Sequence, residues 1–177
     1  MKLVVLDRDG TINEDSADYV RTPAALRPIP GSLEAIGRLT RGGWTVAVAT
    51  NQSGLARGYF DTATLDAMHA RLDALLAPHG GRIDHYAICP HGPETGCACR
   101  KPKPGLLDAI GQRYRMSLAG VPVIGDSRRD LEAARAVGGR PILVRTGNGS
   151  DAAAALGAAV ESYADLAAAV DALLAEG

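Results

Sequence analysis

The chain has 177 residues, of which 46% are hydrophobic and 22% are charged, and its 19 basic and 20 acidic side chains leave a net charge of −1. This balance excludes a disordered chain, and the sequence lacks the basic patch that nucleic-acid binding requires. No apolar stretch reaches the roughly 20 residues of a membrane span, and the apolar run at the N-terminus is too short for a signal peptide, so we expect a cytoplasmic protein. The length predicts a single domain over residues 1–177, and we expect a monomer.

Apolar runs and helical periodicities alternate along the chain. Continuous apolar runs are typical of strands buried on both faces of a parallel sheet, whereas apolar side chains at every third or fourth position indicate helices. In chain order we expect a strand at 3–6, a helix at 32–41, a strand at 44–49, a helix at 62–77, a weaker strand at 83–88, a helix at 105–114, a strand at 121–124, a helix at 129–137, a strand at 141–144 and a helix at 166–174. The Ala-rich stretch at 151–159 is expected to be partly mobile.

This alternation predicts an α/β fold, a Rossmann-like parallel sheet flanked by helices. Ligands of such sheets bind beyond the carboxyl ends of the strands. Three polar segments directly follow three of the predicted strands, at residues 7–11, 50–54 and 125–130. Because these strand ends meet at one edge of the sheet, we expect the three segments to form one site.

Three carboxylates are candidates for that site. Asp7 and Asp9 leave the first strand two positions apart, so both side chains can face one way, and Gly10 lets the chain turn sharply after them. Asp126, at the end of the fourth strand, can supply the third. Carboxylates gathered in one crevice repel each other, and a hard divalent cation such as magnesium compensates them. The sequence therefore predicts a magnesium site suited to phosphate chemistry.

Four motifs follow one another along the chain. They are Asp7-Arg8-Asp9-Gly10-Thr11, Thr50 after an apolar strand, Lys101, and Gly125-Asp126 followed by Asp130. In these motifs the chain resembles the haloacid dehalogenase (HAD) superfamily of phosphatases. The resemblance implies that Asp7 attacks phosphorus to form an aspartyl-phosphate, and that Asp9 serves as general acid and then general base. It also implies that Thr50 and Lys101 stabilise the transferring phosphoryl group.

The same resemblance implies the magnesium ligands, which are the carboxylates of Asp7 and Asp126 and the backbone carbonyl of Asp9. Asp130 is expected just behind these ligands. An acid in the first turn of a helix is also favourable to the helix dipole, and both roles can hold for Asp130. The two arginines at 128–129 are expected to be solvated helix residues.

All three cysteines, Cys89, Cys97 and Cys99, lie within eleven residues, together with His91. An odd number of cysteines in a cytoplasmic protein argues against disulfides, whereas three thiolates and one imidazole make a complete tetrahedral zinc set. We therefore expect a structural Zn²⁺ in a loop that delivers Lys101 to the phosphate crevice. The other histidines have no such neighbours and are expected to be structural.

The intervals between the motifs are too short for the separate cap domain that many members of the superfamily carry. The resemblance therefore implies a capless enzyme whose specificity comes from local loops. These loops are residues 13–29, 52–59 and 92–96. The candidate contacts to the substrate are Asp15, Asp18, Tyr19, Asn51, Gln52, Ser53 and Arg100.

Two capless families with a zinc loop resemble the chain. The heptose 1,7-bisphosphate 7-phosphatases, which act in ADP-heptose and lipopolysaccharide biosynthesis, match nearly its whole length, best at residues 50–58, 100–105 and 144–147. The histidinol-phosphate phosphatases are the alternative, since the short spacing from His91 to Cys97 suits them, but in this form they are usually fused to a second enzyme domain. We therefore expect a sugar bisphosphate as the substrate.

A catalytically silent phosphosugar-binding protein is the alternative of another class. Asp9 distinguishes an enzyme from a binding protein, because a chain that lacked this second acid would be expected to have lost hydrolysis. In this chain Asp9 is present. Magnesium-dependent release of phosphate from a generic ester separates an enzyme from a binding protein.

Overall fold

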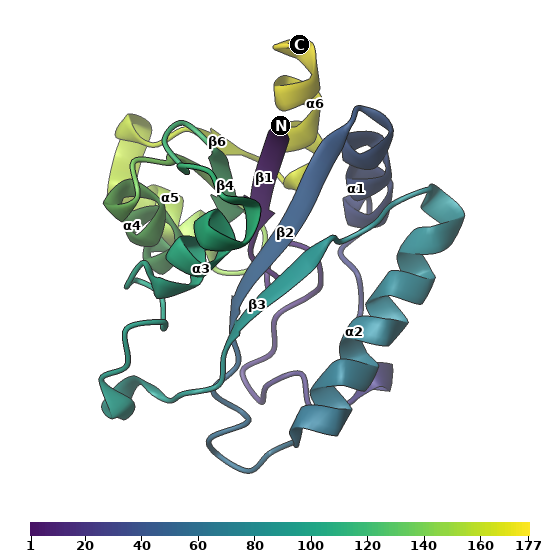
Figure 1. Ribbon diagram of the computed structural model, residues 1–177, viewed down its shortest axis with the longest axis vertical. Coiled ribbons are helices and arrows are strands. Elements are labelled where there is room, and N and C mark those ends of the chain that lie inside the picture. Colours follow the sequence, from purple (N-terminus) through teal and green to yellow (C-terminus); the bar gives the residue numbers. More distant parts are fainter.

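A computed structural model describes residues 1–177 and contains a six-stranded parallel sheet with helices on both faces (Figure 1). The strands are β1 (Lys2–Leu6), β2 (Trp44–Asn51), β3 (His85–Cys89), β4 (Pro122–Gly125), β5 (Arg140–Val144) and β6 (Ser162–Tyr163), in the spatial order β3-β2-β1-β4-β5-β6. The helices are α1 (Ser32–Arg41), α2 (Thr62–Leu76), α3 (Gly105–Tyr114), α4 (Arg128–Ala136), α5 (Gly149–Leu156) and α6 (Leu166–Ala175). Short 3₁₀ turns lie at Pro23–Ala25, Ala77–His79, Pro93–Thr95 and Gly157–Ala159.

The sheet separates two hydrophobic cores. Helices α1, α2 and α6 cover one face and α3 and α4 cover the other (Figure 1). The side chains of β1 alternate between them: Val4 and Leu6 enter the larger core of 23 buried residues, and Leu3 and Val5 enter the smaller core of 14. Because both faces of β1 are enclosed, as its continuous apolar sequence predicts, the residues that leave its carboxyl end start from a firmly held strand.

Every predicted strand and helix is present within a few residues of its expected bounds. Strand β3 begins at His85 rather than at Ile83, because the carboxylate of Asp84 accepts the backbone N–H of Val46 at 2.9 Å and ends the ladder there. Two elements were not predicted. Helix α5 extends over most of the Ala-rich stretch, and β6 has only two residues, too few to show a period. None of the helices has the length and hydropathy needed to cross a bilayer.

The carboxyl ends of the central strands lie at the end of the molecule opposite the chain termini (Figure 1). The backbone N–H of Asp7 donates to the carbonyl of Ile124 at 2.8 Å, which ties the exit of β1 to β4. Between β1 and β2 the chain carries only a loop with one 3₁₀ turn and α1, and between β2 and β3 only α2 and its neighbouring loops. The edge is therefore bordered by loops, and the fold is capless.

Candidate active site

A cavity of about 300 Å³ opens at the carboxyl edge of the sheet. Its walls are Asp7, Asp9, Asp15, Ser16, Ala17, Tyr19, Val20, Asn51, Gln52, Ser53, Arg100, Lys101, Asp126, Ser127, Arg129, Asp130 and Asn148. Only three of these 17 residues are hydrophobic, so the cavity suits a strongly polar ligand. The three strand-end segments that the sequence placed at one edge therefore do meet.

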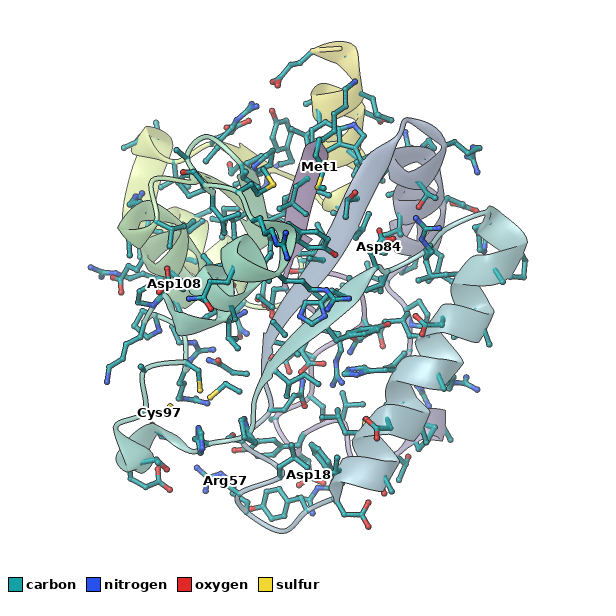
Figure 2. All side chains as sticks on the ribbon, in the orientation of Figure 1. Met1, Asp18, Arg57, Asp84, Cys97 and Asp108 are labelled. Atoms are coloured by element: carbon teal, nitrogen blue, oxygen red, sulfur yellow. The ribbon has the colours of Figure 1, made fainter.

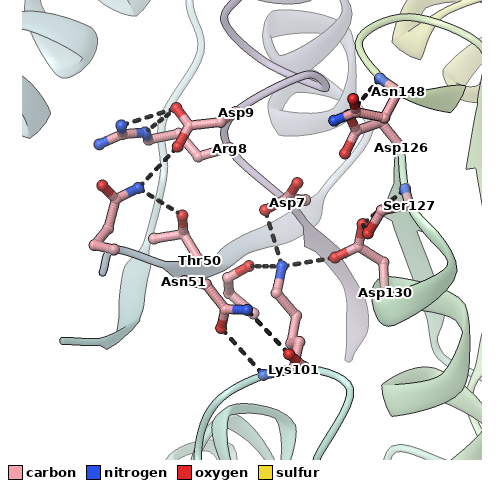
Figure 3. Close-up of polar contacts among 12 residues, drawn as sticks. Asp7, Arg8, Asp9, Thr50, Asn51, Lys101, Asp126, Ser127, Asp130 and Asn148 are labelled. Carbon is pink, nitrogen blue, oxygen red and sulfur yellow. Dashed lines mark hydrogen bonds and ion pairs between the residues drawn. The ribbon is translucent and has the colours of Figure 1, made fainter. Parts of the chain in front are cut away.

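Lys101 is buried at the centre of the site (Figure 3). Its ammonium group donates to Asp7 Oδ1 at 2.9 Å, to Asp130 Oδ1 at 2.6 Å and to the carbonyl of Ala49 at 2.7 Å. Burial favours the neutral amine, but the Asp130 and Asp7 carboxylates outweigh it and raise the pKa of Lys101. The backbone of Lys101 exchanges two hydrogen bonds of 3.1 Å with the side chain of Asn51, which locks the lysine loop to the end of β2.

The carboxylates of Asp7, Asp126 and Asp130 each place an oxygen within 4.8 Å of the others. Burial, and then the charge of Asp130, raise the pKa of Asp7 well above its ordinary range, and burial also raises the pKa of Asp126. An oxygen-only donor set with this excess of negative charge fits a hard divalent cation such as Mg²⁺. Gly10 keeps the site open, because a Cβ at this position would overlap the carboxylate of Asp126.

Asp9 is held on the other side of the cavity by hydrogen bonds to both oxygens (Figure 3). Oδ1 accepts from Arg8 Nε at 3.0 Å, from Arg8 Nη2 at 2.8 Å and from Asn13 Nδ2 at 2.9 Å, and Oδ2 accepts from Gln52 Nε2 at 3.0 Å. Burial opposes ionisation, but the Arg8 charge and these donors together lower the pKa of Asp9. Gln52 also donates to the hydroxyl of Thr50 at 2.9 Å, and Thr50 is buried at the end of β2 beside the residues that line the cavity.

The four predicted zinc ligands lie together, with their donor atoms within 4.8 Å of one another. Cys89 Sγ lies 3.1 Å from Cys99 Sγ, 3.7 Å from Cys97 Sγ and 3.7 Å from His91 Nδ1. No disulfide links the cysteines. Burial and the neighbouring Cys99 thiol raise the pKa of Cys89 to about 12, so a cation is needed to hold this thiol as a thiolate. The cluster could therefore hold a metal ion, two residues before Lys101.

Known proteins resemble this chain over nearly all of it. A D-glycero-beta-D-manno-heptose-1,7-bisphosphate 7-phosphatase from Pseudomonas putida is 61% identical over 149 residues, which cover 84% of this chain and 85% of that protein. The chain belongs to this phosphatase family. The corresponding enzyme from Bordetella bronchiseptica is 58% identical over 84% of the chain and 83% of its own length, and residues 98–170 match the HAD-hydrolase-like family. Membership answers the choice between heptose and histidinol phosphatases that the sequence motifs left open.

Solved structures agree with this assignment. The crystal structure of D,D-heptose 1,7-bisphosphate phosphatase from B. bronchiseptica, complexed with magnesium and phosphate, has a TM-score of 0.97 and 53% identity, and each chain is fully covered by the other. The corresponding enzyme from Burkholderia thailandensis has a TM-score of 0.78 and 43% identity, covering 98% of this chain and 99% of that one.

The predicted sugar contacts divide into two groups. Six of the seven line the cavity: Asp15, Tyr19, Asn51, Gln52, Ser53 and Arg100. Asp18 does not, because its side chain is 87% exposed and its carboxylate accepts from Arg21 Nη2 at 2.7 Å (Figure 2). The 92–96 loop also does not contribute to this cavity, which the loops at 13–29 and 52–59 border instead.

Three residues at the site were missed by the sequence analysis. Arg129 is exposed as expected, yet it lines the cavity from the first turn of α4. Asn148 donates to Asp126 Oδ2 from its backbone N–H at 2.9 Å and to Asp15 Oδ2 from its side chain at 3.1 Å. Because Asn148 follows β5 at the same edge, the strand-end rule could have found it. Arg8 carried no such signal, since nothing in the sequence shows that it is wholly buried.

Proposed function

We propose that the chain hydrolyses the 7-phosphate of D-glycero-β-D-manno-heptose 1,7-bisphosphate in the supply of ADP-heptose for lipopolysaccharide. The observation that carries this proposal is a polar cavity that gathers Asp7, Asp9, Lys101 and Asp126 in a chain of this phosphatase family. The site suits a phosphoric monoester, because it combines a nucleophilic carboxylate, a proton-transfer group and fixed positive charge.

Asp7 is the proposed nucleophile. One of its carboxylate oxygens forms a bond to phosphorus while the bond from phosphorus to O7 of the sugar breaks, and Asp9 gives its proton to O7. The approaching phosphate dianion raises the pKa of Asp9, which Arg8 lowers in the free protein, and so favours this protonated form. Asp9 then takes a proton from water as the water oxygen attacks phosphorus, the Asp7–phosphorus bond breaks, and inorganic phosphate leaves.

Positive charge at the site stabilises the transferring phosphoryl group. Mg²⁺ would be held by the carboxylates of Asp7 and Asp126 and the backbone carbonyl of Asp9, and when bound it neutralises charge on the phosphoryl oxygens. Lys101 already bridges Asp7 and Asp130, which sets its ammonium group beside the nucleophile. Asp130 is therefore proposed to hold Lys101 in place.

Thr50 was predicted to contact the phosphoryl group directly. Its hydroxyl is buried and accepts from Gln52, whose same nitrogen donates to Asp9. We propose that Thr50 keeps this role and, through the same hydroxyl, also positions Gln52 and Asp9.

The rest of the substrate is proposed to lie between the first loop and the start of α4. Arg100 and Arg129 line the cavity on the α4 side and suit the 1-phosphate, because a guanidinium group can form two parallel hydrogen bonds to the oxygens of one phosphate. Asp15 and Tyr19 line it from the first loop and suit sugar hydroxyls. Asp18 is left out of this proposal because its carboxylate already pairs with Arg21.

Zn²⁺ is the proposed ion of the cysteine cluster. Three sulfur donors and one imidazole nitrogen favour zinc over magnesium and leave no position open for catalysis. Its role is to fix the loop that carries Arg100 and Lys101. We also propose a single domain that works as a cytoplasmic monomer: three clustered thiols suit a reducing compartment, and Met1 and Tyr59 are the only large exposed hydrophobic residues.

The decisive experiment is a comparison of kcat/KM on both anomers of heptose 1,7-bisphosphate, fructose 1,6-bisphosphate and histidinol phosphate. The β-anomer should be the best substrate, and a higher value for histidinol phosphate would overturn the substrate assignment. Asp7→Asn should abolish turnover and the covalent phosphate, and Asp9→Asn should bind Mg²⁺ and substrate but turn over far more slowly. Binding of the sugar without any release of phosphate by the unmodified chain would instead support a binding protein.

A further inference from the structure

Arg8 lies between the two catalytic carboxylates in sequence, and its buried side chain contacts Asp9 and His69. It continues the face of β1 that carries Val4 and Leu6, and like them it has 0% of its surface exposed. A guanidinium group without solvent costs several kcal/mol unless every part of it finds a partner. Asp9 is its only ion-pair partner, and both Arg8 Nε and Nη2 donate to the same Asp9 oxygen (Figure 3).

The third nitrogen of Arg8 is bound by a histidine from α2. Arg8 Nη1 lies 3.2 Å from His69 Nε2, and because arginine can only donate, His69 must accept with Nε2 and carry its proton on Nδ1. Burial, and then the charge of Arg8, lower the pKa of His69 to about 4, so the ring remains the neutral acceptor near pH 7.

The ring of His69 is itself fixed by β3. It stacks on Tyr86 with the ring centroids 4.0 Å apart and an interplanar angle of 7°. The hydroxyl of Tyr86 donates to Asp73 Oδ1 at 2.8 Å, which anchors the far end of the stack on α2. The chain from Asp73 through Tyr86, His69 and Arg8 to Asp9 therefore joins residues of α2 and β3 to the exit of β1.

We propose that His69 is a positioning residue for proton transfer, which holds the Arg8 guanidinium in the plane that aims the Asp9 carboxylate at the leaving oxygen of the substrate. This inference rests on the proposed role of Asp9 as general acid. Without an acceptor at His69, a buried N–H of Arg8 would lose its partner, and the guanidinium would turn towards another one. Because Asn13 and Gln52 still hold Asp9, its carboxylate would be misdirected rather than released.

Two substitutions separate the hydrogen bond from the packing. His69→Phe keeps an aromatic ring against Tyr86 but removes the acceptor, whereas His69→Gln restores an acceptor for Arg8. Each is compared with the unmodified protein on heptose 1,7-bisphosphate, whose alkoxide leaving group needs a proton, and on p-nitrophenyl phosphate, whose leaving group does not. The readout is kcat/KM, which reports events up to formation of the aspartyl-phosphate.

His69→Phe should lose about tenfold in kcat/KM on the sugar phosphate, a part of the roughly 10²–10⁴-fold that proton transfer contributes. It should change less than about twofold on the aryl phosphate, and His69→Gln should recover most of the loss. Equal losses on both substrates would indicate a merely structural role and overturn the proposal, as would no loss on either. Tyr86→Leu removes the ring that stacks on His69 but keeps His69 itself, and it should also lose kcat/KM on the sugar phosphate but not on the aryl phosphate. This variant tests the proposal if His69→Phe does not fold.

Asp9→Asn, measured in parallel, distinguishes failure of this inference from failure of the proposed function. It should lose far more activity on the sugar phosphate than on the aryl phosphate. If Asp9→Asn shows that selectivity and His69→Phe does not, only the role of His69 is wrong. If Asp9→Asn shows no selectivity, the role of Asp9 as general acid is wrong as well.

Discussion

Replacing Asp130 with Asn removes one charge from the middle of the site while the shape of the side chain stays the same. In the native protein Asp130 Oδ1 accepts from the Lys101 ammonium at 2.6 Å, and Oδ2 accepts from the backbone N–H and the hydroxyl of Ser127 at 3.1 and 2.9 Å. Its side chain is 3% exposed. Whichever way an amide is turned here, its NH₂ group faces a donor, so either the lysine or the cap of α4 loses its partner.

The cost can be worked out from these contacts. Removing one partner of a buried ion pair costs about 3–5 kcal/mol. Because the amide oxygen still accepts one of the bonds, and because Asp7 is relieved of the neighbouring charge of Asp130, we expect the low end of this range, about 3 kcal/mol. For a chain of 177 residues, 1 kcal/mol corresponds to about 2–4 °C in Tm, so Tm should fall by about 6–12 °C. The activity should fall by about tenfold, because Lys101 keeps Asp7 and the carbonyl of Ala49 but loses the contact that aims its ammonium group.

Thermal and urea unfolding without added Mg²⁺ measure the effect on stability. Ser127→Ala is the matched control, because it removes only the hydroxyl side of the same cap and should cost about 1 kcal/mol. If Asp130→Asn destabilises the protein no more than Ser127→Ala, the ion pair between Asp130 and Lys101 contributes nothing and the reasoning is refuted.

Three further predictions concern other parts of the molecule. Gly10→Ala should lose activation by Mg²⁺, because its Cβ overlaps the Asp126 carboxylate. Gly43→Ala is the control: Gly43 has a similar positive φ but open space around it, so this variant should lose only about 1–2 kcal/mol of stability. Identical magnesium titrations of the two variants would contradict this. A chelator that removes Zn²⁺ from the cysteine cluster under saturating Mg²⁺ should lower both Tm and kcat, and so should Cys99→Ser. Normal turnover of a sample shown by metal analysis to be zinc-free would contradict this. The pKa of His69 is about 4 in the folded chain and about 6.5 when unfolded, so the unfolded chain binds the extra proton between these values. Below pH 6.5 the free energy of unfolding of the native protein should therefore fall by about 1.4 kcal/mol per pH unit more than that of His69→Gln. Urea unfolding of both proteins at about pH 7 and about pH 5 measures this, and an equal shift of the urea midpoint in both would contradict it.

Local patterns in the sequence were sufficient for the sheet, the order of its helices and the location of the site. The apolar run before Asp7 predicts a strand buried on both faces, and such strands need helices on each side, so the edge where Asp7, Thr50 and Asp126 emerge follows from chain order alone. The grouping of the cysteines with His91 was equally visible, because all four candidate ligands lie within eleven residues of the sequence and their spacing needs no knowledge of the fold.

Contacts between distant parts of the chain could be decided only by the tertiary structure. Arg8 and His69 are 61 positions apart and meet only because α2 covers the face of the sheet from which Arg8 projects. Asn148 reaches Asp126 because β5 ends beside β4, and the amide of Gln52 joins Thr50 on β2 to Asp9 beyond β1. Periodicity and spacing report which way a side chain leaves its own strand or helix, but the partner that it meets is set by how these elements pack against each other.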